Sequence, residues 1–193
     1  VLEDIFQPHN ASAVLRTCDC FGIQDVHIIE NKNEYHINPD VALGASNWLS
    51  LFKYNNKDEN TLNCINDLKK KGYTIAATSL NCNSTPIENL KINKKTAILF
   101  GTEKNGLSDI ALNYADIHIR IPMFGFTESF NISVSAAIIL HSITEQLRKS
   151  AVKWQLNESE LIDLKLEWIK NTIHKSELIV EQFFNNLNKN NSH

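Results

Sequence analysis

Thr96-Ala97-Ile98-Leu99-Phe100-Gly101-Thr102-Glu103-Lys104-Asn105-Gly106 joins a continuous apolar run to a polar turn bounded by two glycines. Short apolar runs of this kind are typical of strands buried in a parallel sheet. Because glycine lets the backbone turn sharply, the turn exposes backbone amides and the Glu103 carboxylate at the carboxyl end of the strand. Open α/β sheets bind ligands at that edge. The stretch therefore indicates a ligand-binding turn, and an ordinary strand-to-helix turn is the alternative.

The rest of the chain alternates in the same way, which predicts an α/β fold with a mostly parallel sheet flanked by helices. Strands are expected over residues 1–6, 25–30, 51–54, 73–80, 96–101 and 117–121, and helices over 10–21, 42–48, 59–71, 109–113 and 131–147, with a polar loop over 81–95. Neither glycine nor proline follows Gly125, so helices are expected to the end, including one or two amphipathic helices over 158–187. The expected division is a catalytic domain over 1–150 and a helical extension over 151–193.

Composition is that of an ordinary soluble protein, which we expect in the cytoplasm: 193 residues, 42% hydrophobic and 21% charged. No apolar run approaches the roughly 20 residues of a membrane span, so no membrane partner is expected. The cysteines are expected to be reduced, and Cys18 and Cys20, two apart on a helix, cannot share a metal; no metal is expected. The net charge of −3 argues mildly against nucleic acid as a partner.

Two further segments place polar residues at the starts of helices. The first is Pro8-His9-Asn10-Ala11-Ser12-Ala13-Val14-Leu15-Arg16-Thr17, in which Asn10 as an N-cap and Arg16 as a surface ion pair are the simplest interpretations. The second runs from Ile121-Pro122-Met123 to Asn131-Ile132-Ser133-Val134-Ser135-Ala136-Ala137 and holds more polar side chains than capping needs, which indicates a ligand. Its helix, 131–147, is apolar nearly all round, so we expect a partner subunit to cover part of it.

Together the three segments resemble the three motifs of the SpoU-type RNA 2′-O-methyltransferases of the SPOUT superfamily: Pro8 to Thr17, Leu99 to Leu107 and Ile121 to Ala137. The complete set of motifs, together with a long helical tail after the third, most resembles the members that methylate guanosine 18 in the tRNA D-loop. The resemblance implies S-adenosylmethionine as cofactor, tRNA as substrate, and a homodimer with the active site at its interface. It also implies a deep trefoil knot in the C-terminal part of the sheet, against the general rule that chains are unknotted.

The resemblance also implies the residues of the site. Those expected to bind the cofactor are Thr78, Ser79, Leu80, Gly101, Ile121, Met123, Phe130 and Asn131. Those expected to act in catalysis are Asn10, Arg16, Glu103, Ser129 and Asn131. Asn10 would fix Arg16 or the ribose, Glu103 would hold the arginine or the substrate, and Ser129 and Asn131 would shape the pocket beside the methyl donor.

The family assigns proton removal from the ribose hydroxyl to the arginine of the first motif, here Arg16. Because a guanidinium titrates above about 12, an unassisted arginine is a poor base. We therefore hypothesise that Arg16 clamps a phosphate and orients the hydroxyl, and that a phosphate or water takes the proton. Since the chain has no strongly basic segment, RNA contacts are expected near Lys104, Arg148 and Lys149.

Three alternatives stay open from sequence. One is another RNA substrate, such as ribosomal RNA or an anticodon ribose of tRNA, and the second is an RNA-binding protein without catalysis. The third, a nucleotide-dependent oxidoreductase, is disfavoured because no G-x-G-x-x-G follows the first strand. Family members carry a helical segment ahead of the first motif, and only seven residues precede Pro8 here; without that segment we expect weaker tRNA docking and intact cofactor binding.

Overall fold

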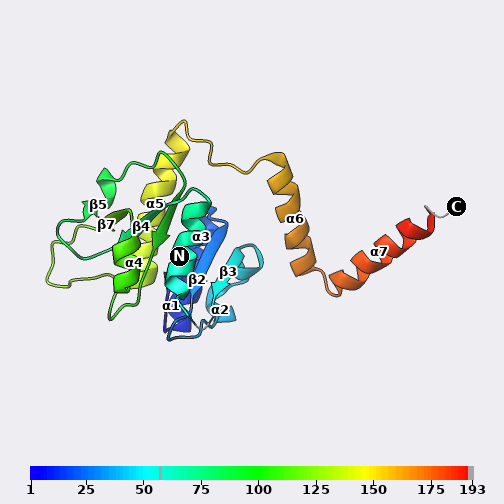
Figure 1. The fold of residues 1–193 in the computed structure, drawn as a ribbon, viewed down its shortest axis with the longest axis horizontal. Helices are drawn as coiled ribbons and strands as arrows, with labels where there is room; N and C mark the ends of the chain where they lie inside the picture. The colour runs from blue at the N-terminus through cyan, green and yellow to red at the C-terminus, as the bar shows by residue number, and fades with distance from the viewer. Residues whose placement is uncertain (57, 191–193) are drawn as a thin grey trace. The chain divides into compact units, whose positions relative to one another are not determined.

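A computed structural model describes residues 1–56 and 58–190, and their side chains as far as residue 186. The chain forms two compact units, Val1–Val152 and Lys153–His193. The first is an α/β unit and the second is helical (Figure 1). No helix among the described residues is long and apolar enough to span a membrane.

Every strand pair of the first unit is parallel, which confirms the expected sheet. One sheet has the order β1-β2-β3 and the other β5-β7-β4-β6. A parallel bridge between Leu2 and Phe100 links the two, because the Glu3 amide donates to the Phe100 carbonyl and the Phe100 amide to the Val1 carbonyl, both at 2.9 Å. The strands are β1 (Leu2–Glu3), β2 (Asp25–Ile29), β3 (Ser50–Tyr54), β4 (Thr74–Thr78), β5 (Thr85–Pro86), β6 (Thr96–Leu99) and β7 (Ile117–Arg120).

Helices cover both faces of the sheet (Figure 1). They are α1 (Pro8–Phe21), α2 (Pro39–Ala42), α3 (Asn60–Lys70), α4 (Asp109–Tyr114) and α5 (Ile132–Lys149), with 3-10 turns η1 (Ala45–Asn47) and η2 (Ile87–Asn89). One core packs α1 and α5 on the sheet through Val14, Ile139 and Ile119. The other packs α3 and α4 through Ile65, Leu99 and Ala111. Because helices fill both faces, ligands can approach only at the edges where the strands end.

Several expected elements differ from those in the structure. The first strand ends at Glu3, because Asp4 takes a left-handed conformation (φ 53°). The helix expected over 42–48 is split into α2 and η1, since Leu43 and Gly44 also have positive φ. The segment 81–95 is not simply a polar loop: it contains β5 and η2, because Thr85 pairs with Ile119 of β7 while Ile87 is buried in the core.

Helix α1 begins earlier than the sequence predicts. Pro8 occupies its first turn, where its fixed φ suits a helix and its missing amide hydrogen costs nothing. The N-cap is Gln7, whose side chain makes no cap hydrogen bond. Asn10 therefore lies inside the helix, and the interpretation of Asn10 as the N-cap is wrong. Its buried side chain is free to bond elsewhere.

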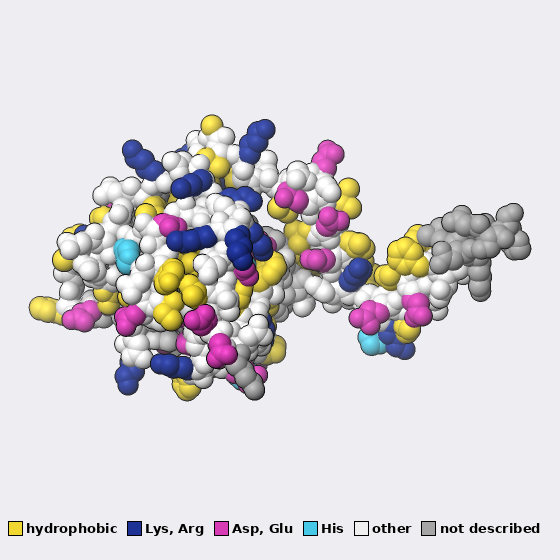
Figure 2. Space-filling view, viewed as in Figure 1, with side chains coloured by type: hydrophobic (Ala, Val, Ile, Leu, Met, Phe, Trp, Pro, Cys, Tyr) yellow, Lys and Arg dark blue, Asp and Glu magenta, His cyan; other side chains and the backbone are white. Residues whose placement is uncertain are grey.

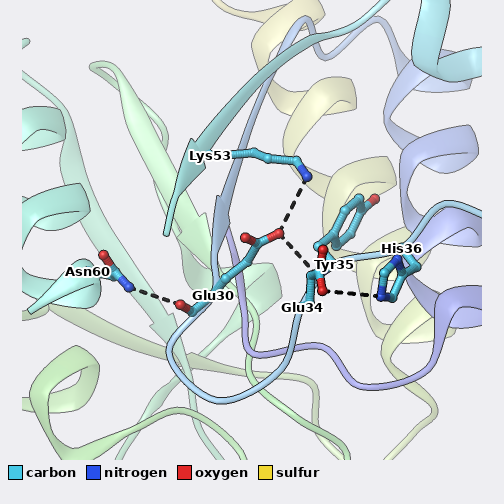
Figure 3. A network of polar contacts seen from close by, with 6 residues as sticks. All are labelled: Glu30, Glu34, Tyr35, His36, Lys53 and Asn60. Carbon is cyan, nitrogen blue, oxygen red and sulfur yellow. Dashed lines mark hydrogen bonds and ion pairs between the residues drawn. The ribbon is translucent and has the colours of Figure 1, made fainter. Parts of the chain in front are cut away.

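A polar network holds the loop after β2 in place (Figure 3). The Glu30 carboxylate accepts from the Tyr35 amide at 3.0 Å and pairs with Lys53 of β3 at 3.5 Å, while the Glu30 carbonyl accepts from Asn60 of α3 at 2.9 Å. Farther along, the Asn38 amide donates to Ser12 Oγ of α1 at 2.7 Å. The loop is thus tied to β3, α3 and α1, which fixes it beside the start of α1.

The long helix α5 is only partly covered within one chain. Ile132, Ala136 and Ile139 are buried against the sheet, whereas Val134 is 43% exposed and Ile138 is half-buried. One side of α5 around Val134 is thus open in the single chain, and the expectation that a partner subunit covers it stays a prediction.

The second unit consists of α6 (Glu158–Thr172) and α7 (Ser176–Asn190), as the pattern over 158–187 predicts. A capping box starts α6, because Asn157 and Glu160 each bond the other's backbone amide. Lys175, at φ 59°, lies between the two helices.

Glu3 ties β1 to both helices on one face of the sheet. Its buried carboxylate accepts from Thr61 Oγ1 at 2.6 Å and from the Ser108 amide and hydroxyl at 2.8 and 2.7 Å. We expect Glu3→Gln to lower the free energy of unfolding by about 1–3 kcal/mol, because an amide NH₂ would then face these donors. Urea unfolding measures the loss. In the control Glu34→Gln, at a side chain 76% exposed, the change should stay within about 0.5 kcal/mol. Equal losses in both variants would contradict this role.

Candidate active site

Polar residues from all three sequence segments meet where the strands end. Asn10 Nδ2 donates to Glu103 Oε1, and also to Gln7 Oε1 at 2.8 Å. Asn131 Nδ2 donates to Asn10 Oδ1 at 3.1 Å and to Glu103 Oε1 at 3.2 Å. We call Asn10, Glu103 and Asn131 the polar triad. Its members lie 93 and 121 residues from Asn10, so the fold alone brings them together.

Each member of the triad is held by a local motif. Asn131 is the N-cap of α5, and its Oδ1 accepts from the Ser133 amide at 2.8 Å and hydroxyl at 2.6 Å, which leaves Nδ2 for the triad. Glu103 lies in a turn that Thr102 and Gly106 close with two backbone hydrogen bonds of 2.9 Å. Asn10 is held by the first turn of α1. All three side chains are therefore oriented before any ligand arrives.

The triad leaves one acceptor aimed at no protein group. Glu103 Oε1 takes both amide donors, and among the described residues no hydrogen bond reaches Glu103 Oε2. Glu103 is exposed, so this oxygen is accessible to a ligand. A carboxylate with a free oxygen can accept a hydrogen bond from a hydroxyl group, and its two amide neighbours keep it from rotating away.

A cavity of about 400 Å³ opens beside the triad at the ends of β4, β6 and β7. Most of the residues predicted to bind the cofactor line this cavity: Thr78, Ser79, Leu80, Gly101, Ile121, Met123 and Phe130. Glu103 and Ser129, which were predicted to act in catalysis, also line the cavity. Asn131 does not line it but lies in the triad at its side. Four lining residues were not among the predicted site residues: Phe100, Ile132, Ser135 and Ile139. The first three lie within the second and third motifs, whereas Ile139 lies outside them on α5.

Arg16 lies apart from this site within one chain. It is exposed on α1, and no hydrogen bond or ion pair joins its side chain to another of the described residues. It follows Asn10 by six positions, which places the two on different faces of the helix. Within one chain, neither Asn10 nor Glu103 bonds Arg16, so the alternatives in which Asn10 fixes the ribose and Glu103 holds the substrate stay predictions. Ser129 is also exposed and makes no hydrogen bond to the triad.

Cysteine and metal chemistry find no support at this site. The four cysteines are free, as expected, and burial raises the pKa of Cys18 to about 11 and of Cys64 to about 12, so both are neutral thiols. In residues 1–56 and 58–190 no three His, Cys, Asp or Glu side chains are grouped so that they could hold a metal ion. The site instead offers hydrogen-bonding groups beside a cavity with a mainly apolar lining.

This fold and site define a class of protein. The model of the SpoU rRNA Methylase family matches residues 1–141, and the chain belongs to that family. Within it, the chain is 49% identical over 179 residues to the tRNA (guanosine(18)-2′-O)-methyltransferase of Borreliella burgdorferi, covering 93% of this chain and 80% of the relative. The solved structure of the A. aeolicus TrmH/SpoU tRNA modifying enzyme superposes with a TM-score of 0.79 at 28% identity, covering 90% and 88% of the two chains.

A more distant neighbour shares the fold. The SpoU methyltransferase AviRb from Streptomyces viridochromogenes, solved in complex with the cofactor AdoMet, matches with a TM-score of 0.67 at 17% identity, over 77% of this chain and 60% of that one. The likeness at this identity shows a common α/β fold and nothing about the residues of this chain.

Gly101 is required by the turn that carries Glu103. A Cβ built on Gly101 overlaps the backbone of Gly106 and Leu107, so the turn must open to admit one. We expect Gly101→Ala to lower the free energy of unfolding by at least about 2 kcal/mol, as steric strain in a packed site does. Gly125→Ala is the control, because a Cβ there meets nothing within 4 Å, and it should change stability by less than about 0.5 kcal/mol. If urea unfolding gave the two variants the same midpoint, the turn would be more adaptable than its packing indicates.

Proposed function

We propose that the chain transfers a methyl group from S-adenosylmethionine to the ribose 2′-OH of guanosine 18 in the tRNA D-loop. The observation that carries the proposal is the polar triad beside the cavity of about 400 Å³, since the triad supplies an oriented carboxylate next to space for a methyl donor. The relative from B. burgdorferi, which is similar over nearly the whole chain, is named for this reaction.

The cavity at the ends of β4, β6 and β7 fits the proposed cofactor. Its volume of about 400 Å³ lies within the usual range for small-molecule sites, and its apolar lining suits an adenosyl group. We assign cofactor binding to Thr78, Ser79, Leu80, Gly101, Ile121, Met123, Phe130 and Asn131. The bound sulfonium supplies an activated methyl group and needs no metal. Thr78 acts through the backbone, because its hydroxyl already donates to the Leu99 carbonyl at 2.8 Å.

The triad would position the attacking hydroxyl. Glu103 Oε2 accepts from the ribose 2′-OH, Asn10 and Asn131 hold the carboxylate, and Ser129 shapes the pocket wall. Bound S-adenosylmethionine would supply the methyl group, with its sulfur as the leaving atom, and the hydroxyl proton would go to a phosphate or water. Close positioning supplies much of the rate enhancement in such a step, since the reacting atoms meet in line.

A homodimer would complete the site. The support is the stripe of α5 that one chain leaves open, with Val134 43% exposed, beside α1, which presents Arg16 to solvent. A second copy packed on α1 and α5 would cover that stripe and bring Arg16 of the partner subunit toward the triad. There its guanidinium clamps an RNA phosphate, for which its planar fork is suited.

We expect groups of Lys and Arg side chains to bind the tRNA, although the net charge of the chain is negative. Figure 2 shows Lys and Arg side chains more numerous on the upper part of one face of residues 1–152 than below. We assign phosphate contacts to Lys104 beside the triad and to Arg148 and Lys149 in the last turn of α5. Binding should therefore weaken as salt rises.

Three finer features belong to the same proposal. Residues 1–150 form the catalytic domain and 151–193 a helical extension, and the enzyme works in the cytoplasm, where tRNA is modified. A deep trefoil knot forms near the cavity. Its support is the strand order, since β7 lies between the earlier strands β4 and β5, and the segments after β4 and β7 line the same cavity.

A methyl-transfer assay on unmodified tRNA, followed by nucleotide mapping, tests the proposal. We expect one 2′-O-methyl group per tRNA at guanosine 18 and none on tRNA in which that nucleotide is 2′-deoxy. Methylation of ribosomal RNA or of an anticodon ribose instead would show that the substrate is wrong. Tight RNA binding with no cofactor binding by calorimetry would identify a non-catalytic RNA-binding protein.

Arg16→Lys tests the phosphate clamp. Lysine keeps the charge but loses the two-pronged hydrogen bonds, so we expect kcat/KM to fall by at least about tenfold, a loss typical of a misplaced substrate. The affinity for the cofactor, measured by calorimetry, should be unchanged, because Arg16 does not line the cavity assigned to the cofactor. Full activity in Arg16→Lys would rule out the clamp.

Mixing two inactive variants tests whether Arg16 acts across the dimer. If Arg16→Ala and Glu103→Ala exchange subunits at random, half of the dimers are mixed and each has one intact site, which restores about a quarter of the wild-type rate. A mixture as inactive as its components would mean that Arg16 and Glu103 of one chain serve the same site.

A further inference from the structure

A second cavity, of about 280 Å³, lies against the same turn as the first. Phe6 and Gln7 of the loop before α1 line it together with Asn33 of the loop after β2 and Ile132 of α5. Glu103 lines both cavities, so the triad stands between them. The proposed cofactor uses only the first cavity, which leaves the second without an assigned ligand.

We propose that the second cavity receives the base of the nucleotide to be methylated, with Phe6 stacking on that base. The inference rests on the proposed function and names the part of the substrate that this cavity binds. In one nucleotide the base and the 2′-OH are carried by adjacent ribose carbons. A base in the second cavity therefore leaves the hydroxyl at the triad, facing the methyl donor in the first.

The lining matches the chemistry of a nucleobase. Ile5 and Ile132 are buried and form an apolar surface, while the Phe6 ring is 73% exposed. An exposed aromatic ring over an apolar floor suits a flat heterocycle, and proteins that recognise unpaired RNA stack bases on such rings. Nothing in the core requires Phe6 at this position, because it is not part of either hydrophobic core.

The amides of the cavity leave hydrogen-bonding groups for the edge of the base. Gln7 Oε1 accepts from Asn10, so its Nε2 remains as a donor, and Asn33 Nδ2 donates to the Asp4 carbonyl at 2.9 Å, so its Oδ1 remains as an acceptor. Guanine offers the O6 and N7 acceptors and the N2 donor that complement them. The cavity therefore offers a donor and an acceptor that a guanine edge can use.

Asp4 fixes the loop that carries Asn33. Its carboxylate accepts from the amides of Asn31 at 2.7 Å and Lys32 at 2.8 Å, while the backbone of Asp4 is in the left-handed region (φ 53°). A non-glycine residue in that region costs energy, which these hydrogen bonds offset. The loop is thus fixed against the segment that carries Phe6, and the cavity exists before RNA binds.

A double-mutant cycle between enzyme and RNA tests the inference. Two full-length tRNAs are compared, one with guanosine at the methylated position and one with an abasic ribose that keeps the 2′-OH. We expect Phe6→Leu to lower kcat/KM about tenfold on the guanosine tRNA, as loss of one base–aromatic stack does, with no further loss on the abasic tRNA. Phe6→Tyr keeps the ring and should retain the wild-type ratio between the two RNAs.

Phe124→Leu is the matched control. Phe124 is 99% exposed and lines neither cavity, so the substitution should change the rates on both tRNAs by the same factor. Cofactor affinity and the urea midpoint of Phe6→Leu should equal those of the wild type, which separates stacking from misfolding. Equal losses on both tRNAs in Phe6→Leu, or no loss on either, would overturn the inference.

Binding measured without the methyl donor separates this inference from the proposed function. The dissociation constants of both tRNAs should show the same coupling to Phe6. Coupling in binding with no methyl transfer would support the base site and overturn the proposed reaction. Methyl transfer to guanosine 18 without coupling to Phe6 in rate or in binding would support the reaction and overturn the base site.

Discussion

The site depends on the parallel pairing of β1 with the end of β6. Two backbone hydrogen bonds of 2.9 Å, from Glu3 to Phe100 and from Phe100 to Val1, join the two sheets. They bring the carboxyl ends of β1 and β6 side by side, and with them the start of α1 and the glycine turn. The buried Glu3 carboxylate strengthens the joint by binding Thr61 and Ser108 on the helices of one face. This pairing therefore places Asn10, in the helix that follows β1, beside Glu103, in the turn that follows β6.

Where the two sheets join, the members of the polar triad satisfy one another's hydrogen-bonding groups. Asn10 is 4% exposed, and a buried amide without partners is costly, so its hydrogen bonds to Gln7, Glu103 and Asn131 stabilise the fold. The same bonds orient Glu103 and leave its second oxygen free. One turn then separates two cavities, and it can be this narrow only because Gly101 has no side chain to meet Gly106.

Two features on the surface of the first unit bear on the partner that we propose for it. Arg16 and the open stripe of α5 around Val134 lie on the two helices that pack together on one face of the sheet. Both would be covered by the second copy of the chain that we propose. The net charge of −3 is also compatible with RNA binding, because phosphate contacts depend on where cations lie and not on their sum.

The sequence by itself determined the layered parallel α/β architecture, most element positions and the three motifs, because apolar periodicity and glycine turns act over a few residues. It left Asn10 undecided, since capping and binding asparagines look alike; only the Pro8 start of α1 and the contacts with Glu103 and Asn131 decided it. The core position of Ile87, the isolation of Arg16 and the Phe6 cavity carry no local signal. They depend on which distant segments pack together, and only the tertiary structure specifies that.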